Sequence, residues 1–187
     1  MSKQADDGSH KTPRFVLVGM MGSGKTTVGS LLADRLGSGF SDTDEEVESI
    51  AGVSVQEMFE KSGEAAFRRA ESEALATLLA PDGPRVVAAG GGAVLSEANR
   101  EMMRREATVV WLRACVGTLT DRVGSGEGRP LLAAVAEVEV DGPKNRLEQL
   151  NEEREQLYQS LADIVVDTDD LSPDEVADAV VSAVQRS

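Results

Sequence analysis

The sequence predicts an α/β protein: a five-stranded parallel sheet flanked by helices in three α/β/α layers. Three observations predict this class. Short valine-rich runs alternate with longer segments of helical periodicity, as in folds with helices on both faces of a parallel sheet. The first run ends in a glycine-rich segment that opens a helix. The length of 187 residues, 41% of them hydrophobic and 28% charged, suits one globular domain.

The first predicted elements lie on either side of the glycine-rich segment. The run RFVLVG, from Arg14, is a predicted buried strand, and residues 25–36 are a predicted helix. The expected apolar face of this helix consists of Val28, Leu31, Leu32 and Leu36. A second strand near GFSDTD leads into a long helical stretch from about Glu45 to Leu79. Glycine disfavours helix interiors, so breaks are predicted near Gly52 and Gly63.

Strands and helices keep alternating in the second half of the chain. The predicted strands are RVVAA, ATVVWL and DIVVD. The predicted helices start at Ser96, cover about Val116–Val123 and Asn145–Leu161, and start again at Ser172. The residues expected to pack in or against the core here are Trp111, Cys115 and Tyr158.

Composition argues against several classes of partner and location. Thirty-three acidic and nineteen basic residues give a net charge of −14, which repels nucleic acid phosphates. No apolar run reaches the roughly 20 residues of a membrane-spanning helix, and the polar residues 1–13 lack a signal-peptide core. A lone Cys115 agrees with a reducing compartment. We expect a cytoplasmic monomer, with residues 1–13 as a flexible tail and 14–187 as a single domain.

Residues Gly19–Thr26 read GMMGSGKT and match the phosphate-binding pattern GxxxxGK[ST], between a predicted strand and a predicted helix. The glycines let backbone N–H groups face inward at a helix N-terminus, whose dipole also favours anions. Lys25 would reach the β- and γ-phosphates of ATP, and the Thr26 hydroxyl would hold Mg²⁺. The expected ATP ligands in this segment are Gly22, Ser23, Gly24, Lys25, Thr26 and Thr27. A chance glycine-rich turn is the alternative.

The motif alone leaves open a kinase, a GTPase switch and a mechanical ATPase. The sequence has no [NT]KxD-like guanine signature, and it is too short for the extra domains of most motor ATPases. The acceptor site must therefore decide. In a kinase, the glycine-rich residues 124–142 would form a mobile lid, with a plain surface loop as the alternative.

Carboxylates and glycines follow two predicted strands, at the sheet edge where α/β proteins bind ligands. Asp42 and Asp44 share a face if their segment is extended, so that one could serve Mg²⁺ and the other accept a substrate proton. Alternatively they form the N-cap and acidic first turn of the next helix, and both interpretations can hold for Asp44. Gly90, Gly91 and Gly92 suit close backbone approach to a ligand, or a tight turn.

Three arginines are candidates for binding anions. Arg68 has Glu71 three residues later on a predicted helix, and a guanidinium held in this way can grip a carboxylate with two hydrogen bonds. Arg129 lies in the lid segment and Arg154 in the charged helix after it, so both could close over an anion. An arginine on a lid can stabilise a transferring phosphoryl group. Solvated surface positions are the alternative for all three.

Together these residues resemble the shikimate kinase family, from about Arg14 to the C-terminus. The resemblance rests on GMMGSGKTTVG, SDTDEEVE, FRRAE, GGG, RPLL, REQLY and VDTDDLSP, in the order that the family shows. It implies ATP-dependent phosphorylation of the 3-hydroxyl of shikimate. It also implies a P-loop kinase fold of the nucleoside-monophosphate-kinase type, with sheet order 2-3-1-4-5.

The resemblance also implies a role for each candidate residue. Lys25, Asp44 and Arg129 would be catalytic, with Asp44 as the candidate base, and Thr26 and Asp42 would hold Mg²⁺. The implied shikimate ligands are Asp44, Arg68, Gly90, Gly91, Gly92 and Arg154. Arg122 would pack against adenine, Arg129 would reach the phosphates with the lid, and the loop after Asp167 would frame the base.

The chain departs from the family between Arg129 and Arg154, where it is several residues longer than usual and carries EVEVD. Two rivals remain open. Another P-loop metabolite kinase, such as a gluconate or nucleotide kinase, would share the phosphate motif and differ in the acceptor pocket. A non-enzymatic nucleotide sensor would bind ATP without turnover.

Overall fold

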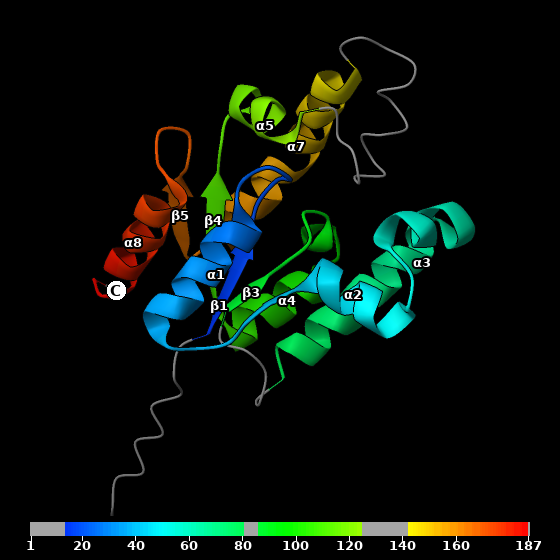
Figure 1. Ribbon diagram of the computed structural model, residues 1–187, viewed down its shortest axis with the longest axis horizontal. Helices are drawn as coiled ribbons and strands as arrows, with labels where there is room; N and C mark the ends of the chain where they lie inside the picture. The colour runs from blue at the N-terminus through cyan, green and yellow to red at the C-terminus, as the bar shows by residue number, and fades with distance from the viewer. Residues whose placement is uncertain (1–13, 81–85, 125–141, 187) are drawn as a thin grey trace, which may run out of the picture.

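A five-stranded parallel sheet forms the centre of the protein (Figure 1). The computed structural model describes residues 14–80, 86–124 and 142–186. The strands are β1 (Phe15–Val18), β2 (Phe40–Asp42), β3 (Val86–Ala88), β4 (Thr108–Arg113) and β5 (Ile164–Asp167). They lie in the order β2-β3-β1-β4-β5, with every neighbouring pair parallel. The predicted fold class and strand order are therefore confirmed. The expected tail, and residues 125–141 of the expected lid with Arg129, lie outside the described residues.

The helices follow the predicted alternation closely. They are α1 (Lys25–Leu36), α2 (Thr43–Ala51), α3 (Val55–Leu78), the 3-10 helix η1 (Ala93–Leu95), α4 (Glu97–Glu106), α5 (Val116–Val123), α7 (Gly142–Leu161) and α8 (Pro173–Val184). The predicted breaks are confirmed, because Gly52 caps α2 with φ 69° and Gly63 interrupts α3 with φ 76°. Both values lie in the left-handed region that glycine tolerates. No helix in the described part of the chain has the length and apolar character needed to cross a bilayer.

Alternation along β1 divides the core between two faces of the sheet. Val16 and Val18 pack on one side, with side chains of α3, α4, α5 and α7. Phe15 and Leu17 pack on the other side, with α1 and α8. Side chains of a strand point to opposite faces in turn, so this buried strand contributes to both layers. The result is the predicted three-layer arrangement, visible in Figure 1 as helices on both faces of the sheet.

Two burial predictions are wrong. Leu36 is 38% exposed, because it lies in the last turn of α1 directly before the Gly37 cap. Cys115 is exposed because it caps the N-terminus of α5, where its sulfur accepts a hydrogen bond from the backbone N–H of Thr118. Trp111 and Tyr158 are buried as predicted, and their rings stack with centroids 5.8 Å apart.

The sheet places several loops at one edge. The glycine-rich segment follows β1, Asp42 ends β2, the triple glycine follows β3, and Thr168 follows β5. The carboxyl ends of parallel strands meet at this edge, so segments far apart in the sequence become neighbours. A small separate core of Val47, Phe67 and Ala74 joins α2 to α3 beside it.

Candidate active site

A cleft of about 710 Å³ runs along this edge of the sheet. The glycine-rich loop and the start of α1 line one part of it, together with Arg122 and Thr168. Asp44, Arg68, Glu71, the triple glycine and Arg154 line another part. Of the predicted site residues, all those in the described part of the chain therefore border a single cleft.

The glycine-rich loop has the conformation of a phosphate cradle. Gly19, Gly22 and Gly24 have φ values of 144°, 82° and 92°, which side-chain-bearing residues rarely adopt. A Cβ atom on Gly19 would lie 2.5 Å from the carbonyl oxygen of Leu112, so space as well as conformation requires glycine there. No side chain caps the first turn of α1. Its backbone N–H groups and helix dipole therefore favour an anion at this end of the cleft.

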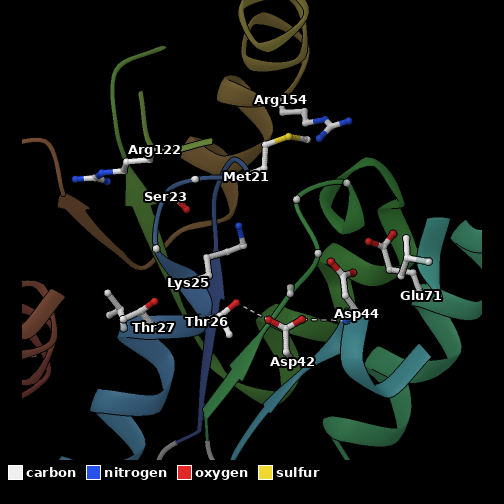
Figure 2. Close-up of a pocket in the computed structure, with 18 of the residues that line it drawn as sticks. Met21, Ser23, Lys25, Thr26, Thr27, Asp42, Asp44, Glu71, Arg122 and Arg154 are labelled. Atoms are coloured by element: carbon white, nitrogen blue, oxygen red, sulfur yellow. Dashed lines mark hydrogen bonds between the residues drawn. The ribbon is translucent and has the colours of Figure 1, made fainter. Parts of the chain in front are cut away.

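Lys25 and Thr26, at the start of α1, line the cleft next to the glycine-rich loop (Figure 2). The Lys25 ammonium donates to the carbonyl oxygens of Gly19 and Met20, both at 2.9 Å. The Thr26 hydroxyl donates to Asp42 Oδ2 at 2.8 Å. A cation and a pair of hard oxygen atoms thus lie at the mouth of the cradle, the chemistry that a magnesium-bound triphosphate needs.

Asp42 and Asp44 combine the two interpretations that the sequence left open. Asp42 is the N-cap of α2, and its Oδ1 accepts the backbone N–H of Asp44 at 2.9 Å. Asp44 lies in the first turn of α2, so the segment is not extended across both residues. Both carboxylates nevertheless line the cleft (Figure 2). Helix capping leaves the second oxygen of Asp42 available to the cleft, because only Oδ1 accepts the backbone N–H of Asp44.

The Asp44 carboxyl group has an unusual proton affinity. Removal from bulk water, and then the nearby carboxylates of Asp42 and Glu71, raise the pKa of Asp44 to about 6. The cations Lys25 and Arg68 oppose this shift without cancelling it. A carboxylate with a raised pKa is a better proton acceptor, and near neutral pH it is still ionised.

Arg68 is held by carboxylates on both sides, of which the FRRAE spacing predicted only Glu71. Its Nη1 donates to Glu71 Oε2 at 2.8 Å, and its Nη2 donates to Glu64 Oε1 at 3.0 Å. Glu71 is 1% exposed, and its other oxygen, Oε1, is buried with no hydrogen-bond partner among the described residues. Burial raises the pKa of Glu71, although Arg68 opposes the shift. The guanidinium is thereby fixed at the border of the cleft.

None of the three glycines after β3 has a positive φ, and side chains at Gly90 and Gly92 would displace the Glu71 carboxylate and the Arg68 guanidinium from their places at the cleft. A Cβ atom on Gly90 would lie 2.2 Å from Glu71 Oε1, and one on Gly92 would lie 2.2 Å from Arg68 Nη1. The Gly90 N–H donates to the Thr43 hydroxyl at 2.7 Å and is therefore occupied inside the protein. Of the three predicted backbone donors, Gly90 is thus engaged with Thr43.

Two further arginines lie at opposite sides of the cleft (Figure 2). Arg154 is 2% exposed, and its Nε is buried with no hydrogen-bond partner among the described residues. Arg122 donates to the hydroxyl of Thr168 at 3.0 Å and to its carbonyl oxygen at 2.6 Å. Arg154 therefore lies with the acceptor groups, and Arg122 lies beside the loop after β5, as the resemblance implied.

Sequence reasoning missed some residues of the cleft. Val55, Phe59 and Phe67 supply an apolar wall beside Arg68. The types and spacing of these three residues match ordinary core residues, so no local signal distinguishes them. Thr168, Leu171 and Pro173, which line the side near Arg122, lie instead in or directly after the loop after Asp167 that the resemblance assigned to the base. Glu71 was predicted only as a partner of Arg68, whereas it also borders the cleft itself.

The comparisons with known proteins agree with this geometry. The sequence profile of the shikimate kinase family matches residues 21–185. A shikimate kinase of Ruegeria pomeroyi is 44% identical over 187 residues, covering 98% of this chain and 91% of the relative. One of a Marinomonas species is 40% identical over 177 residues, 94% of each chain.

A solved structure is similar over nearly the whole fold. The shikimate kinase of Acinetobacter baumannii in complex with shikimate superposes with a TM-score of 0.85 at 34% identity, covering 93% of each chain. Family profile, relatives and solved structure all point the same way. Together with the phosphate cradle and the acceptor groups of the cleft, they establish that the chain belongs to the shikimate kinase family.

Proposed function

We propose that this protein transfers the γ-phosphoryl group of ATP to the 3-hydroxyl of shikimate, giving shikimate 3-phosphate and ADP. The observation that carries the proposal is the single cleft that joins a phosphate cradle to a pocket with two arginines and a carboxylate. Shikimate is a small carboxylate that bears hydroxyl groups, so it needs cations at one end and hydrogen-bond acceptors at the other. The cleft offers both.

Arg68 and Arg154 are the proposed ligands of the shikimate carboxylate. Both border the acceptor part of the cleft, and the buried Arg154 Nε lacks a partner among the described residues. A buried guanidinium gains most from an anion that satisfies its donors. Gly91 and Gly92 would add backbone N–H groups, and the wall of Val55, Phe59 and Phe67 would contact the carbon ring.

Asp44 is the proposed base, or the group that orients the acceptor hydroxyl. The 3-hydroxyl oxygen would bond to the γ-phosphorus while the bond from that phosphorus to the β–γ bridging oxygen breaks. The hydroxyl proton would pass to Asp44, whose pKa of about 6 leaves it ionised and proton-accepting near pH 7. Lys25 would exchange its loop carbonyls for phosphate oxygens, and Arg129 would approach them with the lid.

The residues at the cradle fit Mg²⁺. The Thr26 hydroxyl and the Asp42 carboxylate are hard oxygen ligands 2.8 Å apart, and this ion is usually held by one or two protein oxygens together with phosphates and water. When bound, Mg²⁺ would neutralise charge on the β- and γ-phosphates. Asp42 already has its second oxygen fixed by the Asp44 N–H, so its orientation toward Thr26 is set before ATP arrives.

Arg122 and the loop that contains Thr168 are the proposed adenine site. Two hydrogen bonds fix the Arg122 guanidinium against this loop, and Leu171 and Pro173 supply apolar surface on the same side of the cleft. A planar guanidinium and apolar side chains on one side of a cleft suit the binding of a purine ring. These contacts leave the acceptor groups on the other side for the second substrate.

A coupled assay of ADP release, run with shikimate, gluconate and nucleoside monophosphates, tests the proposal. We expect multiple turnovers with shikimate and none with the other acceptors. Turnover with gluconate or a nucleotide instead would favour another P-loop metabolite kinase. ATP binding without acceptor-dependent turnover would favour a nucleotide sensor.

A further inference from the structure

The turn formed by Gly90, Gly91 and Gly92 lies beside the charged side chains of the proposed acceptor pocket. A Cβ placed on Gly90 would lie 2.2 Å from Glu71 Oε1 and 3.0 Å from Asp44 Oδ1. One on Gly91 would lie 3.3 Å from the carbonyl oxygen of Gly19 in the phosphate cradle and 3.7 Å from Arg154 Nη1. The Arg68 guanidinium lies directly against Gly92. The position of this turn therefore sets the distances among base, clamp and cradle.

Two buried side chains hold the turn from different elements. The Thr43 hydroxyl, 0% exposed, accepts the Gly90 N–H at 2.7 Å. The Tyr158 hydroxyl, also 0% exposed, donates to the Gly91 carbonyl oxygen at 2.6 Å. Each bond is short and joins residues far apart in the sequence; the Thr43 bond is buried and the Tyr158 bond is partly buried. Loss of such a bond leaves a polar group without its partner.

Each anchor also lies close to a proposed substrate ligand, beside it in the chain for Thr43 and one helical turn away for Tyr158. Thr43 lies between Asp42 and Asp44 at the start of α2. Tyr158 follows Arg154 by four residues on α7, so the two share one face of the helix. The Tyr158 ring is fixed in turn by its stack on Trp111. The carboxylate pair and the arginine are thus both tied to the same three glycines.

We propose that Thr43 and Tyr158 are positioning residues for the reaction: they fix Asp44 and Arg154 relative to each other through the glycine turn. The inference rests on the proposed function. Neither side chain touches a reacting atom, so each acts through the residue beside it. Thr43 sets the distance between the base and the cradle. Tyr158 fixes the part of α7 that carries Arg154 against the turn.

Thr43→Val and Thr43→Ser form a matched pair for the first anchor. Valine keeps the shape but leaves the Gly90 N–H unpaired, whereas serine keeps the hydroxyl. Small displacements of reacting groups reduce rates strongly, so we expect Thr43→Val to lower kcat about tenfold or more with KM for ATP unchanged. Thr43→Ser should restore most of kcat. A kcat equal to the wild type in Thr43→Val, with only a lower melting temperature, overturns the role.

Tyr158→Phe removes one hydroxyl and keeps the stack on Trp111. We expect KM for shikimate to rise about fivefold to tenfold while KM for ATP stays constant, because the change displaces Arg154 and leaves the cradle intact. Trp111 is the only tryptophan, so its fluorescence reports whether the stacked ring has moved. Equal changes in both KM values, or no change in either, contradict the assignment.

The double variant Thr43→Val/Tyr158→Phe tests whether both residues act through the same turn. Residues that share a structural element have non-additive effects, so its loss of kcat/KM for shikimate should differ from the product of the single losses. Strictly multiplicative losses would show two independent sites. The wild-type protein is assayed in parallel: if it has no shikimate-dependent turnover, the proposed function fails, whereas normal wild-type turnover with unaffected variants rejects the anchors alone.

Discussion

The phosphate cradle and the acceptor pocket occupy two parts of one cleft, but they are built in different ways. The cradle is a contiguous segment, residues 19–26, whose shape depends on the positive φ angles of three glycines. The acceptor pocket assembles Asp44, Arg68 and Arg154 from three helices around the turn after β3. A cradle of this kind depends on local sequence, whereas the pocket depends on tertiary packing and can be changed one side chain at a time.

This difference predicts how each region responds to substitution. Loss of a group in the cradle should reduce the chemical step, because the transferring phosphoryl group is held there. Loss of a group that binds the acceptor carboxylate should act mainly on KM for the acceptor, whereas loss of the proposed base Asp44 should also lower kcat. The following predictions test that division, starting from the largest expected effect.

Lys25→Ala should lower kcat by about 100- to 1,000-fold, the range for removal of one preorganised charge-stabilising group. The fold should persist, because the cradle conformation comes from its glycines. A coupled ADP assay measures the rate, and thermal unfolding checks the fold. Lys61→Ala, which removes an equal charge from an exposed position on α3, is the matched control and should leave kcat unchanged. A near-normal rate in Lys25→Ala would reject the catalytic role of the cradle.

Arg68→Ala should raise KM for shikimate about 30-fold, corresponding to about 2 kcal/mol for the loss of a charge-assisted contact. KM for ATP should change little, because Arg68 lies on the acceptor side. Arg69→Ala is the matched control, since Arg69 is the next residue on the same helix but is exposed and outside the cleft. Steady-state kinetics with each substrate varied in turn provides both constants. Equal increases for shikimate and ATP would undo the assignment of Arg68.

The same contrast explains how far the sequence could predict the site. The cradle was predictable because the residues that form it are adjacent in the chain, and because its glycines permit the backbone conformation that phosphate binding requires. Asp42 and Asp44 were also predictable, as carboxylates at a strand end. By physical reasoning alone, Arg68 and Arg154 could equally have been surface residues. Only the resemblance of the sequence to the shikimate kinase family assigned both to one binding site. Spacing along a helix carries no information about which distant helix lies opposite.

The remaining errors and omissions have physical causes of the same kind. The strands and glycine breaks were predicted correctly because alternation and glycine conformation are local properties. Leu36 and Cys115 were misplaced because burial at a helix end depends on what packs there. Thr43 and Tyr158 gave no sequence signal, since a hydroxyl becomes an anchor only when the fold brings a backbone group to it.

Asp44→Asn, which removes the proposed base, should also stabilise the folded protein at neutral pH. In the native protein the pKa of Asp44 is raised to about 6, compared with about 3.9 in an unfolded chain. Between these values the folded state binds more protons, so the wild type loses stability relative to the variant as pH rises. The melting temperature of Asp44→Asn should therefore match the wild type near pH 4 and exceed it by about one or two degrees at neutral pH, a small gain because Asp44 is partly exposed and solvent screens its interactions.

Glu45→Gln is the control for that prediction, because Glu45 is the adjacent carboxylate of α2, also exposed, and lies outside the cleft. Its melting temperature should not show the same dependence on pH. If Asp44→Asn were less stable than the wild type at every pH, the Asp44 carboxylate would be a stabilising group. The separation of function from stability in the acceptor pocket would then be wrong.

Arg122→Ala should have the smallest effect, a rise of about two- to fivefold in KM for ATP, as expected when a partly solvated cation leaves an aromatic ring. Both hydrogen bonds of Arg122 go to Thr168, so the substitution also loosens the loop after β5. Arg113→Ala is the matched control. Arg113 pairs with Asp167 just before the same loop but does not line the cleft, so its loss should leave KM for ATP unchanged.

The result would sharpen the comparison between the two regions, because Arg122 belongs to the nucleotide side without belonging to the cradle. A change confined to KM for ATP would show that adenine contacts contribute binding that is the same in ground and transition states. A fall in kcat as large as that of Lys25→Ala would mean that the base-binding loop also aligns the phosphates. An effect on KM for shikimate would mean that the two sides of the cleft do not act independently. Substitutions on the nucleotide side and in the acceptor pocket would then not have separable effects on the two substrates.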